Sequence, residues 1–179
     1  KELKKIAQSV GVDSSIAKNI LSQAGPLLTS KMADNSASRE GLQSLDAALQ
    51  DHDGSIFNNI EDLINPNVDT KGNKILGHIL GSKAESVAET LAQENNTDSN
   101  TTQKIMEMVA PLVLGQLGSE KKAGNMDTSA IFDLLQSEKK DTLSLRNSTL
   151  MNLGKQFLDQ DNDGSIVDDV LGLAKKFMK

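Results

Sequence analysis

An internal repeat constrains the fold of this chain more than any other feature of its sequence. Residues 6–28 align with residues 91–113 when the sequence is shifted by 85 positions. The identical pairs are Ala7 and Ala92, Gln8 and Gln93, Asp13 and Asp98, Ser14 and Ser99, Ile20 and Ile105, Pro26 and Pro111, and Leu27 and Leu112. Self-similarity at a fixed spacing is typical of duplicated architectures, so we expect two copies of one unit. With one further residue of slippage, residues 45–50 pair with residues 131–136, and each copy is therefore expected to contain three helical segments.

The apolar residues within each copy follow helical spacing. The stripes include Leu3, Ile6, Ala7 and Val10, then Ile16, Ile20, Ala24, Leu27 and Leu28, and later Ile105, Met108, Val109, Leu112 and Val113. Such i, i+3, i+4, i+7 patterns predict amphipathic helices, and an aromatic content of only 2% disfavours sheets, which rely on aromatic and β-branched residues. The sequence therefore predicts an all-α, multihelical fold. Pro26 and Pro111 fall inside these patterns, where proline kinks or breaks a helix at a cost of about 3 kcal/mol, so we expect a bend in both copies.

Three segments are predicted along the chain. Residues 65–73 carry Pro66 and Gly72 among polar side chains, which marks a boundary between the repeat units. The predicted segments are residues 1–66, the first helical repeat unit, residues 67–136, the second unit, packed with the first as one domain, and residues 137–179, an inserted segment with an Asp-rich loop and a C-terminal helix. The polar, charged stretches 118–127 and 137–148 are expected to be exposed loops or a mobile excursion.

Composition excludes several classes of function. The net charge of −6 opposes binding to a phosphate backbone, so we expect no nucleic-acid partner. The chain has no cysteine, which excludes disulfides, thiolate zinc sites and cysteine nucleophiles. No apolar run approaches the roughly 20 residues that span a bilayer. We therefore expect no membrane span and a cytoplasmic location, while an upstream targeting segment before Lys1 stays an open alternative.

The stretch "DQDNDGSIVDD", residues 159–169, is similar to an EF-hand calcium loop. Such a loop places oxygen ligands at positions 1, 3, 5, 7 and 9, glycine at 6 and a bidentate carboxylate at 12. The candidate ligands are Asp159, Asp161 and Asp163 at positions 1, 3 and 5, the carbonyl of Ser165 at 7, and Asp168 and Asp169 at 10 and 11. Position 12 is Val170, so a trailing carboxylate must reach the ion from a helix that begins earlier than in an EF-hand. We predict that this loop is a Ca²⁺ site.

A capped acidic turn is the alternative for the same stretch. Ser165 and Asp168 fit the S-x-x-D capping pattern, and acidic residues near a helix start are favoured by the helix dipole. Capping does not account for Asp159 and Asp161, because three carboxylates on one tight turn repel one another unless a cation neutralises them. The related turn "DHDGS", residues 51–55, lacks the leading carboxylate, and there we expect a cap without a metal.

Four segments together carry a family resemblance. They are "QDHDGSIFNNI" (50–60), "GNKILGHILG" (72–81), "VAPLVLGQLG" (109–118) and "DQDNDGSIVDDVLG" (159–172). In this order they resemble the YidB-like bacterial family known only as a domain of unknown function, the 937 group, from about residue 15 to the end of the chain. The resemblance implies a bacterial, multihelical protein with no assigned activity and no catalytic residues.

The two histidines do not form a recognisable catalytic motif. His78 lies between apolar residues of a predicted helix, so we expect it to be packed or partly buried. His52 fits a solvated acidic turn better than a transition-metal site. We therefore predict a non-enzymatic structural or protein-interaction module with a protein partner or self-association, and no small-molecule substrate is evident. The alternatives are an enzyme without a recognisable motif and a helix-turn-helix-like nucleic-acid-associated protein.

Overall fold

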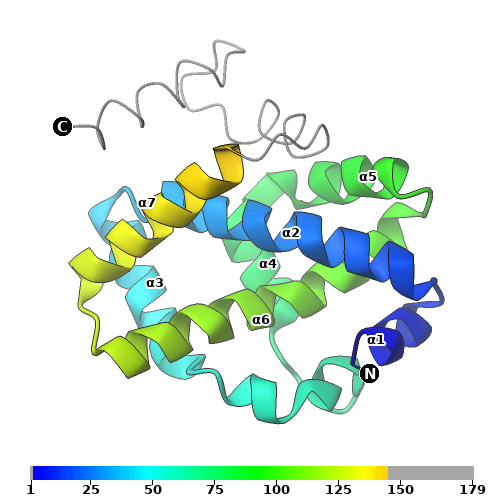
Figure 1. Ribbon diagram of the computed structural model, residues 1–179, viewed down its shortest axis with the longest axis horizontal. Helices are drawn as coiled ribbons and strands as arrows, with labels where there is room; N and C mark the ends of the chain where they lie inside the picture. Colours follow the sequence, from blue (N-terminus) through cyan, green and yellow to red (C-terminus); the bar gives the residue numbers. More distant parts are fainter. Residues whose placement is uncertain (1, 145–179) are drawn as a thin grey trace.

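The computed structural model describes residues 2–144, which form seven α-helices and three short 3-10 helices and contain no strand (Figure 1). The α-helices are α1 (Glu2–Val10), α2 (Ser14–Asn35), α3 (Arg39–Asp51), α4 (Gly72–Leu80), α5 (Ala84–Glu94), α6 (Ser99–Gly124) and α7 (Thr128–Ser144), and the 3-10 helices are η1 (Ser55–Asn58), η2 (Ile60–Ile64) and η3 (Gly81–Lys83). The predicted all-α, multihelical class is confirmed. Among these helices, none is long and apolar enough to cross a membrane.

The two longest helices, α2 with 22 residues and α6 with 26, pack against each other at the centre of the fold. Helices α1 and α7 pack on α2, and helices α4 and α5 pack on α6, with α4 behind the central pair (Figure 1). Helix α3 contacts α6, α7 and the end of α2. The α2–α6 pair is therefore the scaffold on which every other α-helix of the described chain is placed.

Both central helices begin after an aspartate and continue through a proline. Asp13 and Asp98 are the N-cap residues, and the Asp98 side chain accepts a hydrogen bond from the Thr101 backbone N–H at 2.7 Å, whereas Asp13 makes no side-chain cap bond. A capping carboxylate satisfies one of the N–H groups that lack a partner in the first turn. Pro26 lies inside α2 and Pro111 inside α6, so neither proline breaks its helix.

The core lies where the apolar stripes of these helices meet. Its most buried members, each with no more than 2% of its surface exposed, include Ile20, Leu27 and Leu28 of α2, Leu49 of α3, Leu76 of α4, Leu91 of α5, Ile105 and Met106 of α6, and Ile131 and Leu135 of α7. Burying one such side chain stabilises a fold by about 1.5–3 kcal/mol. No aromatic residue is among these side chains, so the centre of the core is built from aliphatic groups and the Met106 thioether.

Two stretches expected to be exposed loops are largely helical, and that prediction is wrong. Helix α6 extends to Gly124 and α7 to Ser144, which covers most of residues 118–127 and the first two thirds of residues 137–148. The reason is tertiary contact that the local polarity conceals. Lys121 forms an ion pair with Asp46 of α3, and Lys139 is only 1% exposed because it points into the fold.

Two glycines set how closely α3 and α4 approach α6. A Cβ atom on Gly118 would lie 1.8 Å from the backbone oxygen of His52, at the end of α3, and a Cβ atom on Gly72 would lie 2.0 Å from the backbone oxygen of Glu107. Both neighbours are main-chain atoms, so only glycine allows these contacts. The end of α3 and the start of α4 are thereby fixed on the same central helix, at separate points along it.

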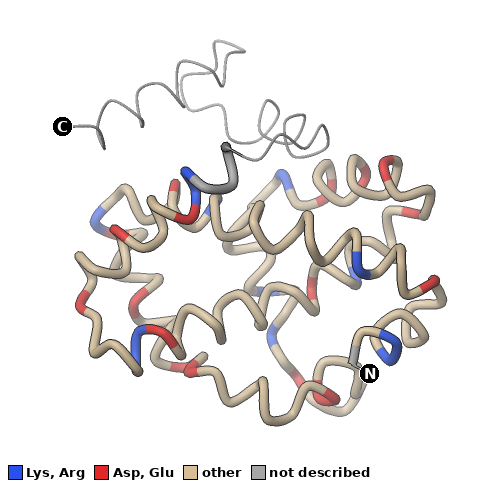
Figure 2. The backbone as a smooth tube through the Cα atoms, in the orientation of Figure 1, with Lys and Arg blue, Asp and Glu red and all other residues tan. Residues whose placement is uncertain are grey.

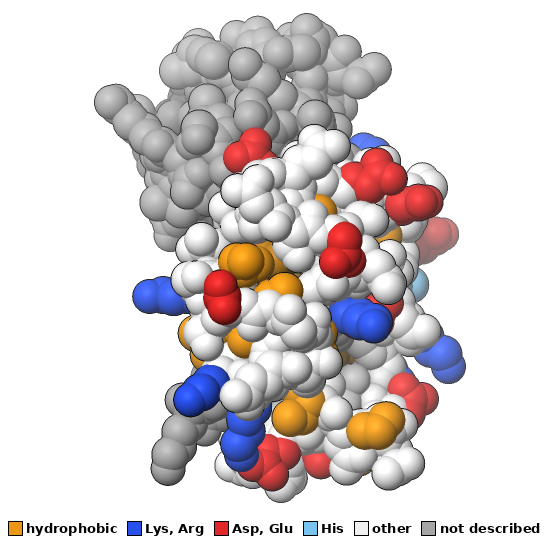
Figure 3. Space-filling view, turned by 90° about the vertical axis from the view of Figure 1, so that its right-hand side faces the viewer, with side chains coloured by type: hydrophobic (Ala, Val, Ile, Leu, Met, Phe, Trp, Pro, Cys, Tyr) orange, Lys and Arg blue, Asp and Glu red, His pale blue; other side chains and the backbone are white. Residues whose placement is uncertain are grey.

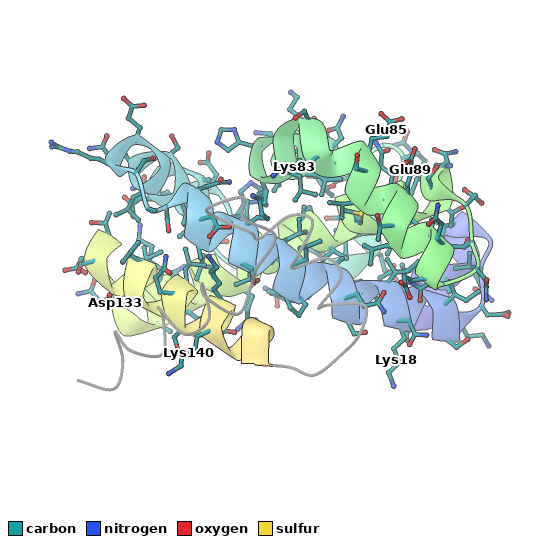
Figure 4. All side chains as sticks on the ribbon, turned by 90° about the horizontal axis from the view of Figure 1, so that it is seen from above. Lys18, Lys83, Glu85, Glu89, Asp133 and Lys140 are labelled. Carbon is teal, nitrogen blue, oxygen red and sulfur yellow. The ribbon has the colours of Figure 1, made fainter. Side chains whose placement is uncertain are left out.

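Charged residues of both signs are distributed over the helices, and acidic positions recur along α5 (Figure 2). Glu85 and Glu89 project outward from α5 (Figure 4). On the face shown in Figure 3, apolar side chains reach the surface only as small separate patches between charged and polar groups. Among described residues, the large hydrophobic side chains that count as exposed are Phe57 and Val68.

Candidate binding pocket between α3 and α4

The predicted calcium ligands lie outside the described residues. They are Asp159, Asp161, Asp163, Ser165, Asp168 and Asp169. The calcium loop therefore stays a prediction. Within residues 2–144 no group of three or more His, Cys, Asp or Glu side chains is arranged to hold a metal ion.

The related turn at residues 51–55 is closed by its own backbone. The Asp53 carboxylate accepts a hydrogen bond from the Ser55 N–H at 3.1 Å, and Gly54 adopts φ 97°, a left-handed conformation that favours glycine. The hydrogen bonds from Ser55 hold the pKa of Asp53 below its ordinary value, and the Lys122 ammonium at 3.8 Å lowers it further. In this turn the aspartate fixes the chain between α3 and η1.

A pocket of about 890 Å³ lies between α3 and α4. Its apolar lining comes from four helices and consists of Met32 of α2, Leu45, Ala47 and Ala48 of α3, Ile75 and Ile79 of α4, and Leu114 of α6. The polar lining consists of Asp34, Asn35, Ser38, Ser44, His52, Lys71, Lys74 and His78. The pocket thus has an apolar floor, built on the central helices, beneath a rim of polar and charged groups.

Basic side chains dominate the charged part of this rim. Lys71 and Lys74 come from the start of α4, His78 lies one turn further along the same helix, and His52 caps the C-terminal end of α3. Lys74 and His78 are four residues apart, so they share one face of α4. Neither Lys71 nor Lys74 forms an ion pair with another residue in the described part of the chain. The rim therefore carries two lysine charges that are not held in ion pairs within residues 2–144.

The backbone at Lys71 is strained and held from both sides. Lys71 has φ 60° and ψ 20°, a left-handed conformation that is uncommon for a residue with a Cβ atom. Its N–H donates to the Asp69 carboxylate at 2.9 Å, and its carbonyl accepts from the Ile75 N–H at 2.9 Å. The next residue, Gly72, is pressed against α6. These contacts fix the point from which the Lys71 side chain leaves the backbone.

The one acidic group of the pocket lining, Asp34, is already engaged by lysines. Its Oδ1 lies 2.5 Å from Nζ of Lys139, which belongs to α7 and is 1% exposed, and its Oδ2 lies 4.0 Å from Nζ of Lys31. Gln136 of α7 also donates to the Ala33 carbonyl at 3.1 Å. Helix α7 therefore holds the C-terminal end of α2 and offsets the negative charge of Asp34. Burial lowers the pKa of Lys31, although Asp34 acts in the opposite direction.

The two histidines differ in environment. Burial lowers the pKa of His52, and the nearby Lys71 acts in the same direction, while Asp51 and Asp53 partly oppose the shift. His78 is exposed at the rim, so the prediction of a packed or partly buried His78 is wrong. The reason is register, because Ile75, Leu76, Ile79 and Leu80 form the buried face of α4 and leave position 78 on the outer side.

Sequence reasoning missed this pocket because no local motif encodes it. Its lining comes from residues 32–52, residues 71–79 and Leu114, and only the folded chain brings these together. The available signal was weak. Both histidines and the lysines of "TKGNK", residues 70–74, flank the predicted boundary between the repeat units, in a chain whose net charge is negative. The sequence signal that could have indicated the pocket is this local cluster of basic residues in an acidic protein.

A second, smaller hollow of about 380 Å³ lies between α2, α6 and α7. Its lining is mainly apolar, includes Leu21, Val113 and Leu134, and extends to Phe57, which is 40% exposed. Its charged lining residues are the two acids Glu120 and Glu138. This groove has a charge opposite to that of the α3–α4 pocket.

Comparison with known proteins gives one match. A family model described as a bacterial protein of unknown function, DUF937, matches residues 1–120. No curated protein matches the chain, and no solved structure does. The matched region contains the entire lining of the α3–α4 pocket, whereas α7, with Lys139, lies beyond it.

Proposed function

This chain belongs to the bacterial family of unknown function DUF937, and we propose that it is a non-enzymatic binding module whose α3–α4 pocket takes up a small molecule with an apolar body. The observation that carries the proposal is the pocket itself. Binding sites for small molecules are typically clefts of about 300–1,000 Å³ that combine apolar walls with a few fixed polar groups. The α3–α4 pocket, at about 890 Å³, has this size and this composition.

The arrangement of the pocket supports binding rather than catalysis. A catalytic site needs a nucleophile or a general base whose orientation another group fixes. Here the carboxylate of Asp34 is held by Lys139 at 2.5 Å, and the two histidines stand on separate helices at the rim. Floor residues such as Leu114, 4% exposed, and Met32, 3% exposed, belong to the core and form a rigid apolar surface. A ligand would be recognised there without being transformed.

The test is binding of a neutral apolar probe, N-phenyl-1-naphthylamine, to the full chain. Its fluorescence rises in apolar surroundings, and the chain has no Trp or Tyr to interfere. We expect saturable binding that is lost in Ala47→Phe, because Ala47 is an exposed residue of the pocket lining and a phenyl group there would occupy the cavity.

The matched control is Ala123→Phe. Ala123 is also an exposed helical alanine, but it belongs to α6 and lines no hollow described above. This variant should bind the probe as the parent does. Binding that does not saturate, or that Ala47→Phe and Ala123→Phe reduce equally, would reject the proposal.

We further propose that the Asp-rich loop binds Ca²⁺ and stabilises the chain. The support is the spacing of Asp159, Asp161 and Asp163 together with the trailing pair Asp168 and Asp169. A ligand that binds only the folded chain raises its stability by mass action. Millimolar Ca²⁺ should therefore raise the melting temperature measured in EGTA, and Mg²⁺ should not reproduce the rise.

The matched variants for the calcium site are Asp161→Ala and Asp53→Ala. The first should abolish the calcium response, because it removes the ligand at position 3, and the second should preserve it, because Asp53 closes a different turn. Equal calcium responses in the parent and in both variants would contradict the assignment.

We also propose that the fold arose by internal duplication. Helices α1, α2 and α3 are followed, in the same order, by α5, α6 and α7. Helix α2 begins at Ser14 and α6 begins at Ser99, the separation that aligns the two repeats, and each contains its proline at the same distance from the start. An experimental structure in which α1–α3 superposes on α5–α7 would support the proposal, and unrelated packing of the two triplets would reject it.

A further inference from the structure

We propose that the α3–α4 pocket selects a single-chain anionic amphiphile, with its acidic head group at Lys71, Lys74 and His78 and its alkyl chain along the apolar floor. The inference rests on the proposed binding function and adds the chemical class of the ligand. It commits to one occupant because the pocket combines an extended apolar surface with charge of one sign at its rim.

The head-group site is defined by charge and by fixed geometry. Lys71 and Lys74 make no ion pair within residues 2–144, so their charges are available to an anion at the start of α4. The backbone at Lys71 is held by Asp69 and by the contact of Gly72 with α6, which limits the positions that its ammonium can reach. His78 stands one helical turn beyond Lys74 and adds a hydrogen-bond donor on the same face.

The wall opposite these lysines does not oppose an anion. Asp34 is the acidic residue of the pocket lining, and its carboxylate is paired with Lys139 at 2.5 Å and lies 4.0 Å from Lys31. The two lysines offset its negative charge. The charged side chains that line the pocket, Lys71, Lys74 and Asp34, therefore sum to a positive charge in a chain whose net charge is −6. Selection of an anion is a property of this pocket and not of the whole surface.

The tail site is the apolar floor that α3, α4 and α6 provide. The lining includes Ile75 and Ile79 of α4, Leu45 of α3 and Leu114 of α6. The apolar surface available to a ligand comes mainly from Leu45, Ala47 and Ala48 of α3, because Ile75 and Ile79 retain only 8% and 7% of their surface exposed. A linear alkyl chain can follow this row of side chains, and each methylene that it buries should improve affinity by about fourfold.

The experiment measures how well four probes of equal chain length displace N-phenyl-1-naphthylamine from the full chain, at concentrations below micelle formation. The probes are dodecanoate, dodecyl phosphate, dodecanol and dodecyltrimethylammonium. Both anions should displace the dye at concentrations about tenfold lower than the neutral and cationic probes, because a charge-assisted contact typically contributes a factor of this size. A clear order between the two anions would identify the preferred head group within the proposed class.

The variant pair separates head-group recognition from general binding. In Lys71→Asn/Lys74→Gln, the preference for anions should disappear while dodecanol displaces the dye as before; Asn is chosen because it tolerates the left-handed backbone of position 71. The control Lys4→Gln/Lys18→Gln removes the same charge from exposed positions outside the pocket lining and should keep the preference. Figure 4 shows Lys18 on the side of the molecule opposite α3 and α4.

The outcomes distinguish an error in the anionic ligand class from an error in the proposed binding function. If all four probes displace the dye equally, or if both double variants change the anion preference alike, the anionic class is wrong and the pocket still binds apolar molecules. If dodecyltrimethylammonium displaces best, the sign of the pocket field is wrong. If the dye itself does not bind, the proposed function fails together with this inference.

Discussion

Gly118→Ala should destabilise the chain, because it adds one methyl group where α6 meets the end of α3. The new Cβ would lie 1.8 Å from the backbone oxygen of His52, 2.8 Å from its carbonyl carbon and 3.1 Å from the backbone oxygen of Leu49. Ordinary carbon contacts are about 3.5–4 Å, so the C-terminal end of α3 would have to move outward by well over 1 Å. No side-chain rotation can relieve this clash, because its partners are main-chain atoms.

The magnitude follows from two opposing terms. Overpacking a tight contact costs about 1–3 kcal/mol, and a clash with backbone belongs at the upper end of that range. Replacing a helical glycine by alanine returns about 1 kcal/mol of helix propensity. The net loss should be about 2 kcal/mol in the free energy of unfolding, which corresponds to a fall of about 4–8 °C in the melting temperature of a chain of this size.

Gly77→Ala is the matched control for this substitution. Gly77 is an exposed residue of α4, and a Cβ atom there would meet nothing within 4 Å. This variant should gain about 0.5–1 kcal/mol, because alanine favours the helix and restricts the unfolded chain. Urea unfolding followed by far-UV circular dichroism gives both values. A Gly118→Ala variant as stable as the parent would refute the close approach of α3 and α6. Because His52 lines the pocket, Gly118→Ala should also weaken binding of N-phenyl-1-naphthylamine.

Three further predictions follow from polar contacts. Lys139→Ala should lower the free energy of unfolding by about 2–3 kcal/mol in urea titrations, because it leaves the partly buried Asp34 without its closest partner, and a loss below 0.5 kcal/mol would contradict that pairing. Asp98→Ala should lower the melting temperature by more than Asp13→Ala, because only Asp98 makes a side-chain cap bond, and equal shifts would count against this difference. The pKa of His52 is lower in the folded chain than in the unfolded chain, so the unfolded chain takes up its proton first. The stabilisation due to neutral His52 is present above about pH 6.5 and is lost as the pH falls below it; His52→Gln should flatten the melting temperature between pH 5 and 7, and an unchanged slope would reject the shift.

Periodicity predicted what depends on local sequence. The stripe that includes Ile16, Ile20 and Ala24, preceded by the cap signal at Asp13, predicted a helix where α2 begins. Pro26 and Pro111 both stand inside continuous helices, so neither proline ends its helix, and the predicted bend stays a prediction. Packing along the rest of each helix compensates for the hydrogen bond that proline cannot donate. The rule that proline breaks a helix considers local sequence only and does not include this packing energy.

Tertiary contacts determined what the sequence could not predict. Residues 137–140, "SEKK", read as a solvated loop, yet Lys139 is almost fully buried beside Asp34. The pairing joins residues 105 positions apart, and no local pattern reports it. The pocket also depends on tertiary contacts, because Lys74 and His52 line the same cavity only after α3 and α4 have both packed on α6.

The charge of the pocket depends on a helix beyond the region that matches the family. The match ends at residue 120, and α7 begins at Thr128. Yet α7 supplies Ile131 and Leu135 to the core and Lys139 to Asp34. If the lysine is absent, the Asp34 carboxylate contributes an unbalanced negative charge to the wall of the pocket, and an anion is repelled where this chain would bind one. A relative with the same pocket lining but no lysine at the position of Lys139 should therefore bind dodecanol without preferring dodecanoate. In that case, a residue that does not line the pocket would determine which class of ligand the same fold binds.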